Sequence, residues 1–198
     1  MKELIAEMES YAEKENVPII EKDSIKFIRK YIELNNVKSI LEIGSAIGYS
    51  SILMASVNDS INVTTIERDE KRYMECLKNV KKANMEGKII PVYQDALELN
   101  LPNTKFDLIF IDAAKAQNIK FFEKFKYCLK DGGAIITDNL HFHGLVGNKD
   151  KAQSKNVRAM IAKIEEYIEF LKNNKEFVTK FYDIGDGLSV SFRKVNEK

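Results

Sequence analysis

The fold of this chain is decided by residues 41–51, which read Leu41-Glu42-Ile43-Gly44-Ser45-Ala46-Ile47-Gly48-Tyr49-Ser50-Ser51. An apolar run ends before Gly44, small residues follow, and an apolar helical pattern resumes after Ser51. This order indicates a strand, a tight loop and a helix start, where free backbone N–H groups face outwards. Gly44 and Gly48 let the backbone approach a ligand closely because glycine has no Cβ. The next predicted strand, Asn62 to Ile66, ends at Glu67, whose carboxylate can bind both hydroxyls of a ribose. The unit is therefore predicted to bind a cofactor that contains a nucleoside.

The spacing of the glycines distinguishes between two such cofactors. Dinucleotide-binding loops have the pattern G-x-G-x-x-G, with a pyrophosphate at the helix N-terminus, whereas Gly44 and Gly48 are separated by three residues. The carboxylate of Glu42, beside this loop, would repel a pyrophosphate but suits a sulfonium or an α-amino group. The pattern therefore favours S-adenosylmethionine over NAD. In isolation the two glycines also fit a plainer interpretation, in which they only let the helix pack closely against the strand.

Composition and charge indicate a single domain over residues 1–198, since 44% of the residues are hydrophobic and can form a buried core. The formal net charge of +1 provides no global attraction to nucleic acid or membrane, and the basic stretch from Lys71 to Lys88 is interpreted as a solvated helix face. Cys76 and Cys128 have no C-x-x-C spacing, which indicates reduced thiols. Without a signal-peptide pattern or an apolar run of membrane-spanning length, we expect a cytoplasmic protein with no membrane partner.

Apolar periodicity divides the chain into three segments, 1–36, 37–140 and 141–198. The first is predicted to hold two helices, the second of them capped by Asp23 or Ser24. The middle segment alternates strands and helices and holds the cofactor and metal core. Its last helix is expected over 119–129, before Gly132-Gly133 turn the chain into a strand over 134–137. The last segment holds a loop, a long amphipathic helix over 157–171, and a hairpin of 176–182 with 188–193.

Continuously apolar strands that alternate with helices are typical of a parallel sheet buried on both faces. We therefore predict a Rossmann-like, doubly wound α/β fold. Its seven-stranded sheet is expected to be mostly parallel, with the antiparallel C-terminal hairpin added at one edge. In such sheets ligands bind at the carboxyl ends of the strands.

Polar side chains follow the predicted strands at this end of the sheet. Asp95 follows the third strand, Asp112 the fourth, and Asp138 and Asn139 the fifth. An aspartate after a strand is often only a helix cap or a turn residue, and Asp95 alone fits that interpretation. If the fourth and fifth strands are neighbours, their ends lie roughly 5 Å apart, so two carboxylates and one amide can share an ion. These ligands suit a hard cation such as Mg²⁺ or Ca²⁺ rather than Zn²⁺, and they leave room for water and substrate oxygens.

Several motifs in combination resemble one family. They are Leu41-Glu42-Ile43-Gly44 with Gly48-Tyr49-Ser50, Phe106-Asp107 with Ile109-Phe110-Ile111-Asp112-Ala113 and Lys115, Thr137-Asp138-Asn139, and Asp186-Gly187-Leu188. Together they resemble the metal-dependent O-methyltransferases of the caffeoyl-CoA and catechol type, over roughly residues 17 to 193. Three further stretches are similar to the bacterial members that methylate 5-hydroxyuridine at the tRNA wobble position: Val17-Pro18-Ile19-Ile20, the loop over 42–50, and Asn156-x-Arg158.

The resemblance implies a role for each matching position. Asp112, Asp138 and Asn139 would hold the metal, Mg²⁺ or another hard divalent cation, and Asp112 and Lys115 would act in catalysis beside the acceptor oxygen. The expected partner is the anticodon loop of tRNA, and because family members are commonly dimers we expect a homodimer. S-adenosylmethionine would contact Glu42, Gly44, Ser45, Gly48, Tyr49, Ser50, Glu67, Arg68, Asp95, Ala96 and Asp112.

This chain departs from the family pattern around the acceptor. Gln117-Asn118 stands where an aromatic residue is usual, and His141-Phe142-His143 stands in place of a tryptophan-like position. Both departures affect the identity of the acceptor and not that of the cofactor. His141 is a candidate for stacking on or hydrogen bonding to a flat acceptor ring, with a polar loop residue as the alternative. Arg158, with Lys149, Lys151 and Lys155, is a candidate for RNA phosphate contacts, with a solvated helix start as the alternative.

The chemistry of methyl transfer decides what acceptors are suitable. The sulfonium methyl group is already activated, whereas a neutral hydroxyl is a poor nucleophile, and a divalent ion lowers its pKa and orients it. A catechol or a 5-hydroxypyrimidine offers two adjacent oxygens to such an ion, and Lys115 could take the proton or only pair with the carboxylates. About fifteen residues connect Asn139 to the late helix, too few for a lid over a small acceptor, which favours tRNA over a small catechol-like molecule. A cofactor-binding protein without catalysis, or a nicotinamide oxidoreductase, is the alternative from another class.

Overall fold

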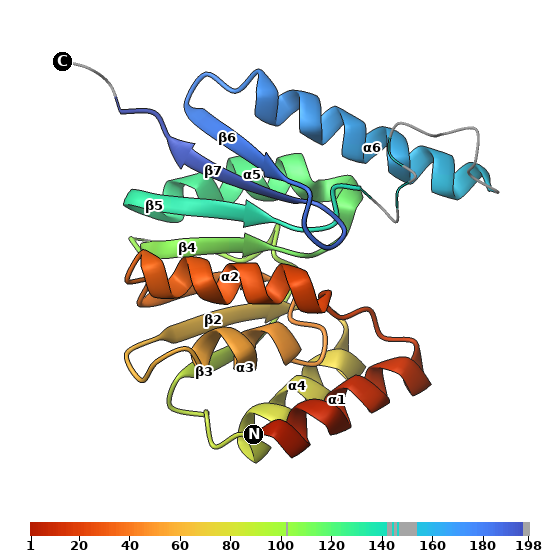
Figure 1. Ribbon diagram of the computed structural model, residues 1–198, viewed down its shortest axis with the longest axis vertical. Coiled ribbons are helices and arrows are strands. Elements are labelled where there is room, and N and C mark those ends of the chain that lie inside the picture. Colours follow the sequence, from red (N-terminus) through yellow and green to blue (C-terminus); the bar gives the residue numbers. More distant parts are fainter. Residues whose placement is uncertain (102, 142–143, 145, 147–153, 196–198) are drawn as a thin grey trace.

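The computed structural model describes residues 1–101, 103–141, 144, 146 and 154–195. Helices and strands alternate through the middle of the chain, as the apolar periodicity predicts, and a hairpin closes it (Figure 1). In order, the elements are α1 (Lys2–Glu15), α2 (Lys22–Leu34), β1 (Ser39–Ile43), α3 (Tyr49–Ala55), β2 (Asn62–Glu67), α4 (Glu70–Lys82), β3 (Ile89–Tyr93), β4 (Phe106–Ile111), the 3₁₀ turn η1 (Lys115–Gln117), α5 (Asn118–Phe125), the 3₁₀ turn η2 (Lys126–Cys128), β5 (Leu129–Thr137), α6 (Lys155–Lys172), β6 (Phe177–Tyr182) and β7 (Leu188–Arg193).

The seven strands form one sheet in the order β3-β2-β1-β4-β5-β7-β6. The first five strands run parallel, and β7 pairs antiparallel with both β5 and β6. The predicted α/β fold, with its mostly parallel sheet and C-terminal antiparallel hairpin, is confirmed. The strand order reverses at β1, between β2 and β4, and ligands of doubly wound sheets bind in the crevice at such a point.

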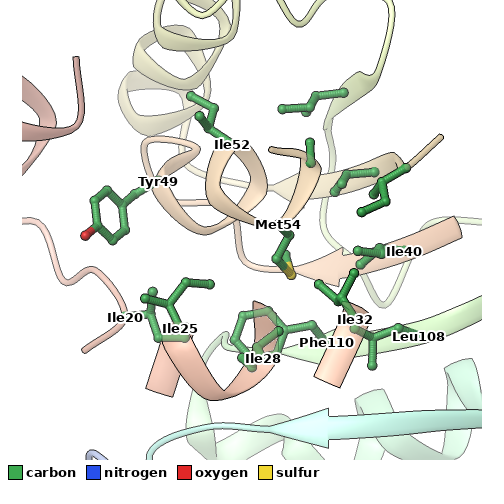
Figure 2. Packing of buried hydrophobic residues seen from close by; sticks show 14 of the residues in the cluster. Ile20, Ile25, Ile28, Ile32, Ile40, Tyr49, Ile52, Met54, Leu108 and Phe110 are labelled. Carbon is green, nitrogen blue, oxygen red and sulfur yellow. The ribbon is translucent and has the colours of Figure 1, made fainter. Parts of the chain in front are cut away.

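Two hydrophobic layers cover the sheet because its strands are apolar on both faces. Helices α1 to α4 cover one face, where Ile28 and Ile32 of α2 pack over Ile40 and Phe110 (Figure 2). Helices α5 and α6 cover the other face, where Phe122 and Tyr167 are fully buried. Neighbouring strand residues therefore alternate between the layers, Ile40 in the first and Leu41 in the second. This alternation decides which side chains at the strand ends can reach the crevice.

Two predicted boundaries are wrong, and each has a physical reason. Helix α2 begins at Lys22 with Glu21 at its N-cap, so Asp23 and Ser24 lie inside the first turn and do not cap it. Helix α5 ends at Phe125 and β5 already begins at Leu129, so the chain does not turn at Gly132-Gly133 into a short strand. Instead β5 runs through both glycines with an irregular register against β4, between the pairs Phe106–Leu129 and Leu108–Ala134.

Ion pairs attach the opening helix to the domain. Glu7 of α1 pairs with Lys82 of α4, and Glu15 pairs with Lys71, which accounts for part of the basic stretch that the sequence placed on a solvated face. These pairs are exposed, and such pairs contribute little stability individually. Within the described ranges, no helix combines the length and the apolar character that crossing a membrane requires.

Candidate functional site

A cavity of about 660 Å³ opens at the carboxyl ends of the parallel strands, where β1 lies between β2 and β4. Its floor comes from the loop after β1 and from the residues that follow β2, β3 and β4. Most of the predicted cofactor and catalytic residues line it, namely Gly44, Ser45, Tyr49, Ser50, Glu67, Arg68, Asp95, Ala96, Asp112, Lys115 and Asn139. Residues from five different stretches of sequence are therefore brought to one cavity by the strand order.

The loop after β1 depends on Gly44. Its φ of +97° lies in the region that favours glycine, and a Cβ built there would lie 2.4 Å from the carbonyl oxygen of Asp112. The backbone N–H groups of Gly44 and Ser45 both donate to the carbonyl of Ile66, at 2.9 and 3.2 Å. The loop is consequently held against the ends of both neighbouring strands, and its backbone forms one wall of the cavity.

Glu67, at the end of β2, holds this loop from the other side. Its Oε2 accepts a hydrogen bond from the backbone N–H of Ala46 at 2.9 Å, and its Oε1 accepts from those of Arg68 and Asp69, each at 2.9 Å. The side chain is buried, yet it lines the cavity. Oε1 already accepts two hydrogen bonds, whereas Oε2 keeps a further lone pair, so Glu67 can also accept one hydroxyl of a ribose.

Glu42 does not contact the cavity, which corrects the expected cofactor contact. Because strand residues alternate, its side chain lies under α3, fully buried, and accepts hydrogen bonds from the hydroxyls of Ser50, Ser51 and Thr65. Burial disfavours the charged carboxylate and raises the pKa of Glu42 to about 7, although the three hydroxyl donors oppose that shift. Glu42 therefore anchors the start of α3 and acts on the cofactor loop only indirectly.

Gly48 is also absent from the cavity wall. Its φ is +84°, and a Cβ there would lie 2.8 Å from the Sγ of Cys76 in α4. Here the plainer interpretation, a glycine that lets two elements pack closely, describes the geometry. The Cys76 thiol is buried under the loop, and burial raises its pKa to about 12.

Glu42→Gln is expected to flatten the pH dependence of stability. The folded state keeps the proton of Glu42 up to about pH 7, whereas the unfolded chain loses it near 4.5, so stability is greatest below 4.5 and falls as the pH rises towards 7. Between pH 5 and 8 this residue should cost the wild type on the order of 3 kcal/mol. Urea unfolding at both pH values measures the difference. Glu86→Gln, on the exposed surface, is the control and should match the wild type; an equal slope in wild type and Glu42→Gln contradicts the expectation.

The predicted ion ligands converge at one corner of the cavity. The Nδ2 of Asn139 lies 3.3 Å from Asp112 Oδ1 and 3.4 Å from Asp138 Oδ2, and the Nζ of Lys115 lies 2.7 Å from Asp112 Oδ1. Asn139 has a φ of +67°, a conformation that asparagine tolerates better than most residues, and this turns its side chain back towards the neighbouring strand end. The buried position of Asp138 and the charge of Asp112 raise the pKa of Asp138 well above its ordinary value.

This donor set fits a hard divalent cation. Two carboxylates repel one another here, and a cation between them would remove that repulsion. The amide of Asn139 presents its nitrogen to both carboxylates, and exchange of its nitrogen and oxygen by a flip would present an oxygen ligand. Among the described residues no group of three or more His, Cys, Asp or Glu side chains could hold an ion. An ion at this corner therefore depends on Asn139 and on oxygens from water or acceptor.

The two predicted substrate contacts lie away from the cavity wall. The ring of His141 packs beside Gly187, and its Nδ1 lies 3.4 Å from Asp183 Oδ1. Arg158 is exposed in the first turns of α6, where its backbone N–H donates to the carbonyl of Ser154. His143, Lys149 and Lys151 lie outside the described residues. Neither His141 nor Arg158 lines the cavity, so a contact with an acceptor requires that the acceptor extends beyond it.

Sequence reasoning missed the residues that cover the cavity. The link between α1 and α2 contributes Pro18, Ile19, Ile20 and Glu21 to its wall. The stretch Val17-Pro18-Ile19-Ile20 carries part of the family resemblance, but nothing local indicates that it reaches strand ends more than twenty residues away. Other cavity residues that were not predicted include Arg72, Gln94 and Phe121, whereas Gln117, which the sequence analysis places around the acceptor, does line the cavity.

Comparison with known proteins agrees with this geometry. A family profile described as O-methyltransferase matches residues 1–194. Caffeoyl-CoA O-methyltransferase from Populus kitakamiensis is 30% identical over 186 residues, which cover 90% of this chain and 78% of that protein. A crystal structure from Staphylococcus aureus, provisionally named a caffeoyl-CoA O-methyltransferase, is 42% identical with a TM-score of 0.92, covering 96% of this chain and 92% of that one. An O-methyltransferase from Bacillus cereus, solved in complex with SAH, shares the fold at 24% identity and a TM-score of 0.82, covering 97% of this chain and 91% of that one.

The sheet order and the cavity at the strand ends define a class I methyltransferase fold. Within that class the chain belongs to the O-methyltransferase family, which the caffeoyl-CoA O-methyltransferases share.

Proposed function

We propose that the protein transfers the methyl group of S-adenosylmethionine to the 5-hydroxyl of 5-hydroxyuridine at the tRNA wobble position, with Mg²⁺ or another hard divalent cation. The observation that carries this proposal is the convergence of Asp112, Asp138, Asn139 and Lys115 beside the Gly44 loop. Oxygen ligands for a hard ion and a cavity suited to a nucleoside cofactor lie at one place, as methyl transfer to an ionised hydroxyl needs.

The cavity walls suit the donor. Bound S-adenosylmethionine supplies a methyl group already activated by the sulfonium. Oε2 of Glu67 is placed to accept a ribose hydroxyl, and Gly44, which has no side chain, and the small Ser45 leave space for the methionine part. The adenine has space beside Ala96 and Asp95, where Asp95 Oδ1 already accepts from the N–H of Leu97 at 2.8 Å. In this placement the methyl group would be directed towards Asp112 and Lys115, which line the same cavity.

The acceptor side needs an ionised oxygen. A divalent cation on Asp112, Asp138 and Asn139 would lower the pKa of the acceptor hydroxyl and orient it. As the C–O bond forms and the C–S bond breaks, the hydroxyl proton must leave, and Lys115 lies where it can receive one. The ammonium form of Lys115 pairs with Asp112 at 2.7 Å, so Lys115 can act as a base only when that carboxylate is engaged elsewhere.

Two features support a pyrimidine in tRNA as the acceptor. Few residues connect Asn139 to α6, so a large substrate that provides its own walls is favoured. In addition, Gln117 lines the cavity, and its Oε1 is buried without a hydrogen-bond partner among the described residues. The N3–H of a uracil ring can satisfy such an oxygen, and an unpaired buried acceptor is costly.

Nucleoside mass spectrometry tests the proposal. Transfer RNA that carries 5-hydroxyuridine is incubated with the protein, Mg²⁺ and labelled S-adenosylmethionine, and a simple catechol is tested in parallel. We expect label in 5-methoxyuridine. No transfer to tRNA at any Mg²⁺ concentration, with transfer to the catechol, would leave the small phenolic acceptor as the function. The names of the caffeoyl-CoA relatives favour that second candidate.

Gln117→Ala is expected to lower kcat/KM for tRNA by about tenfold, since one buried hydrogen bond contributes about 1 to 2 kcal/mol. Methylation of a catechol, which has no ring N–H, should change little. Steady-state kinetics with both acceptors measures the contrast. Gln94→Ala, a second carboxamide on the cavity wall after β3, should affect the KM for S-adenosylmethionine instead. Equal losses on tRNA and catechol would contradict a role in reading the base.

Three further expectations stay predictions. We propose a homodimer, which light scattering of the purified protein would test. A cytoplasmic location and binding of the tRNA anticodon loop follow from the same proposal. Binding of the anticodon loop is measured by the shift of tRNA in a native gel, with and without the anticodon stem-loop as competitor.

A further inference from the structure

Helix α2 reaches the proposed ion site through a single buried hydroxyl. Ser24, in its first turn, is fully buried, and its Oγ donates a hydrogen bond of 3.1 Å to Asp138 Oδ1. The two residues are 114 positions apart in the chain, so the contact exists only because the fold packs α2 beside the end of β5. Asp138 is 1% exposed, and water therefore has little access to replace this donor.

The hydrogen bond from Ser24 fixes which carboxylate oxygen of Asp138 faces Asn139. With Oδ1 bound to Ser24, the other oxygen, Oδ2, is the one that lies near the Asn139 amide, at 3.4 Å. A carboxylate without that contact could rotate about its χ2 and turn either oxygen towards Asp112. Hydrogen bonds to the outer atoms of a ligating carboxylate orient it in this way, and their loss typically costs 10- to 100-fold in metal affinity or activity.

The turn before β7 holds Ser24 in place. A Cβ built on Gly185 would lie 2.3 Å from Ser24 Oγ, so only a glycine leaves room for the hydroxyl. The same turn supports the loop after Asp138, since the carbonyls of Gly187 and Asp186 accept from the N–H groups of Leu140 and His141, at 3.0 and 2.7 Å. Ser24 of helix α2 thus holds the Asp138 carboxylate, and the turn over 185–187 contacts both Ser24 and the loop that follows Asp138.

We infer that Ser24 is a positioning residue for the ion site. Its hydroxyl orients the Asp138 carboxylate and thereby connects the ion ligands to helix α2, which follows the link of Pro18 to Glu21 in the cavity wall. The inference rests on the proposed function, because it assumes that Asp138 binds an ion. It extends that function to a residue outside the wall of the cofactor cavity.

Binding of Mn²⁺ to the purified protein, followed by electron paramagnetic resonance, tests the inference without a turnover measurement. Ser24→Ala is expected to weaken Mn²⁺ binding at least tenfold, while the affinity for S-adenosylhomocysteine stays within about twofold of wild type because Ser24 is absent from the cavity wall. Ser189→Ala is the matched control. Ser189 is equally buried, lies opposite Thr137 in the sheet, and its hydroxyl has no hydrogen-bond partner within the described part of the chain, so its loss should leave Mn²⁺ affinity unchanged.

A second variant, on the turn before β7, disturbs the same hydrogen bond between Ser24 and Asp138. Gly185→Ala displaces the Ser24 hydroxyl without removing it and should weaken Mn²⁺ binding similarly. If both act through one hydrogen bond, the double variant should bind Mn²⁺ no more weakly than Ser24→Ala alone. Wild-type affinity in a folded Ser24→Ala, or fully additive losses in the double variant, would overturn the inference.

The same titration separates this inference from the proposed function. If the wild type binds Mn²⁺ no better than Asp138→Asn, the ion site fails and the role of Ser24 fails with it. If the wild type binds Mn²⁺ and Ser24→Ala does not, but no tRNA is methylated, the positioning role holds and only the proposed acceptor is wrong.

Discussion

Replacing Asp138 by asparagine is expected to lower methyl transfer by about a thousandfold and to leave the affinity for S-adenosylhomocysteine within about twofold of wild type. A thousandfold loss corresponds to about 4 kcal/mol of transition-state stabilisation, in the range that a catalytic metal supplies. Asparagine keeps the shape of the side chain but removes the charge that a divalent cation needs. Cofactor binding should persist because Asp138 does not line the cavity.

The same change should not unfold the protein. Asp138 is buried beside Asp112, and both burial and that neighbouring charge disfavour its ionised form. Asparagine relieves this cost, and its Oδ1 can still accept from Ser24, so the melting temperature should stay constant or rise. Asp138→Ala should lose turnover equally but also lose stability, since it leaves the Ser24 hydroxyl unpaired.

Labelled methyl transfer, calorimetric titration with S-adenosylhomocysteine and thermal melting measure the three quantities. Asp23→Asn is the control, because Asp23 lies in the same turn of α2 as Ser24, is exposed and pairs only with Lys26 among the contacts described. It should change none of them. If Asp138→Asn lost cofactor affinity as severely as turnover, Asp138 would belong to the cofactor site and the ion role would be wrong.

The ends of the strands were predictable because each is marked by a local sequence pattern. An apolar run followed by Gly44, Glu67, Asp112 or Asp138 can be read from the chain, and parallel strands must bring such residues to one end of the sheet. Their meeting at one end of the sheet followed from the order of helices and strands. The predicted seven-stranded sheet depended on the same alternation, which is strong in continuously apolar strands.

Side-chain direction was harder to predict. Glu42 lies in a strand whose residues alternate between two buried layers, and a glutamate beside a glycine loop suggests a ligand contact more readily than a buried anchor. The hydroxyls of Ser50, Ser51 and Thr65 were the available signal, since three donors around one buried carboxyl can replace water.

Contacts between segments that are distant in the sequence are not indicated by any local sequence pattern. The link of Pro18 to Glu21 covers the cavity, and Ser24 reaches Asp138 across the domain, although neither has a local motif. A serine near a helix start predicts an N-cap, because its side-chain oxygen can accept a hydrogen bond from a free backbone N–H. In the structure the helix begins earlier, and the hydroxyl instead satisfies a buried carboxylate.

Gly44→Ala should abolish binding of S-adenosylhomocysteine and lower the free energy of unfolding by about 2 to 4 kcal/mol. The first part of this cost is backbone strain at a φ of +97°, and the second is the contact of 2.4 Å that a Cβ makes with the Asp112 carbonyl. That carbonyl cannot move aside easily, because the Asp112 N–H donates to Ile43 at 3.0 Å and ties the end of β4 to β1. Relief of the clash must therefore displace the loop that forms the cavity wall.

Gly48→Ala provides the matched comparison, because its φ of +84° imposes similar strain but its Cβ meets a side-chain atom, the Sγ of Cys76 at 2.8 Å. In a Cys76→Ala background the nearest remaining atoms lie 3.6 Å away, so Gly48→Ala should regain part of its stability there. Gly44→Ala has no such partner to remove and should not be rescued by Cys76→Ala. Urea unfolding and calorimetric titration on Gly44→Ala and Gly48→Ala, each with and without Cys76→Ala, measure the loss of stability and the loss of cofactor binding. A folded Gly44→Ala that binds S-adenosylhomocysteine with wild-type affinity would show that the loop after β1 does not contact the cofactor, because a wall displaced by a backbone clash cannot hold the same ligand equally well.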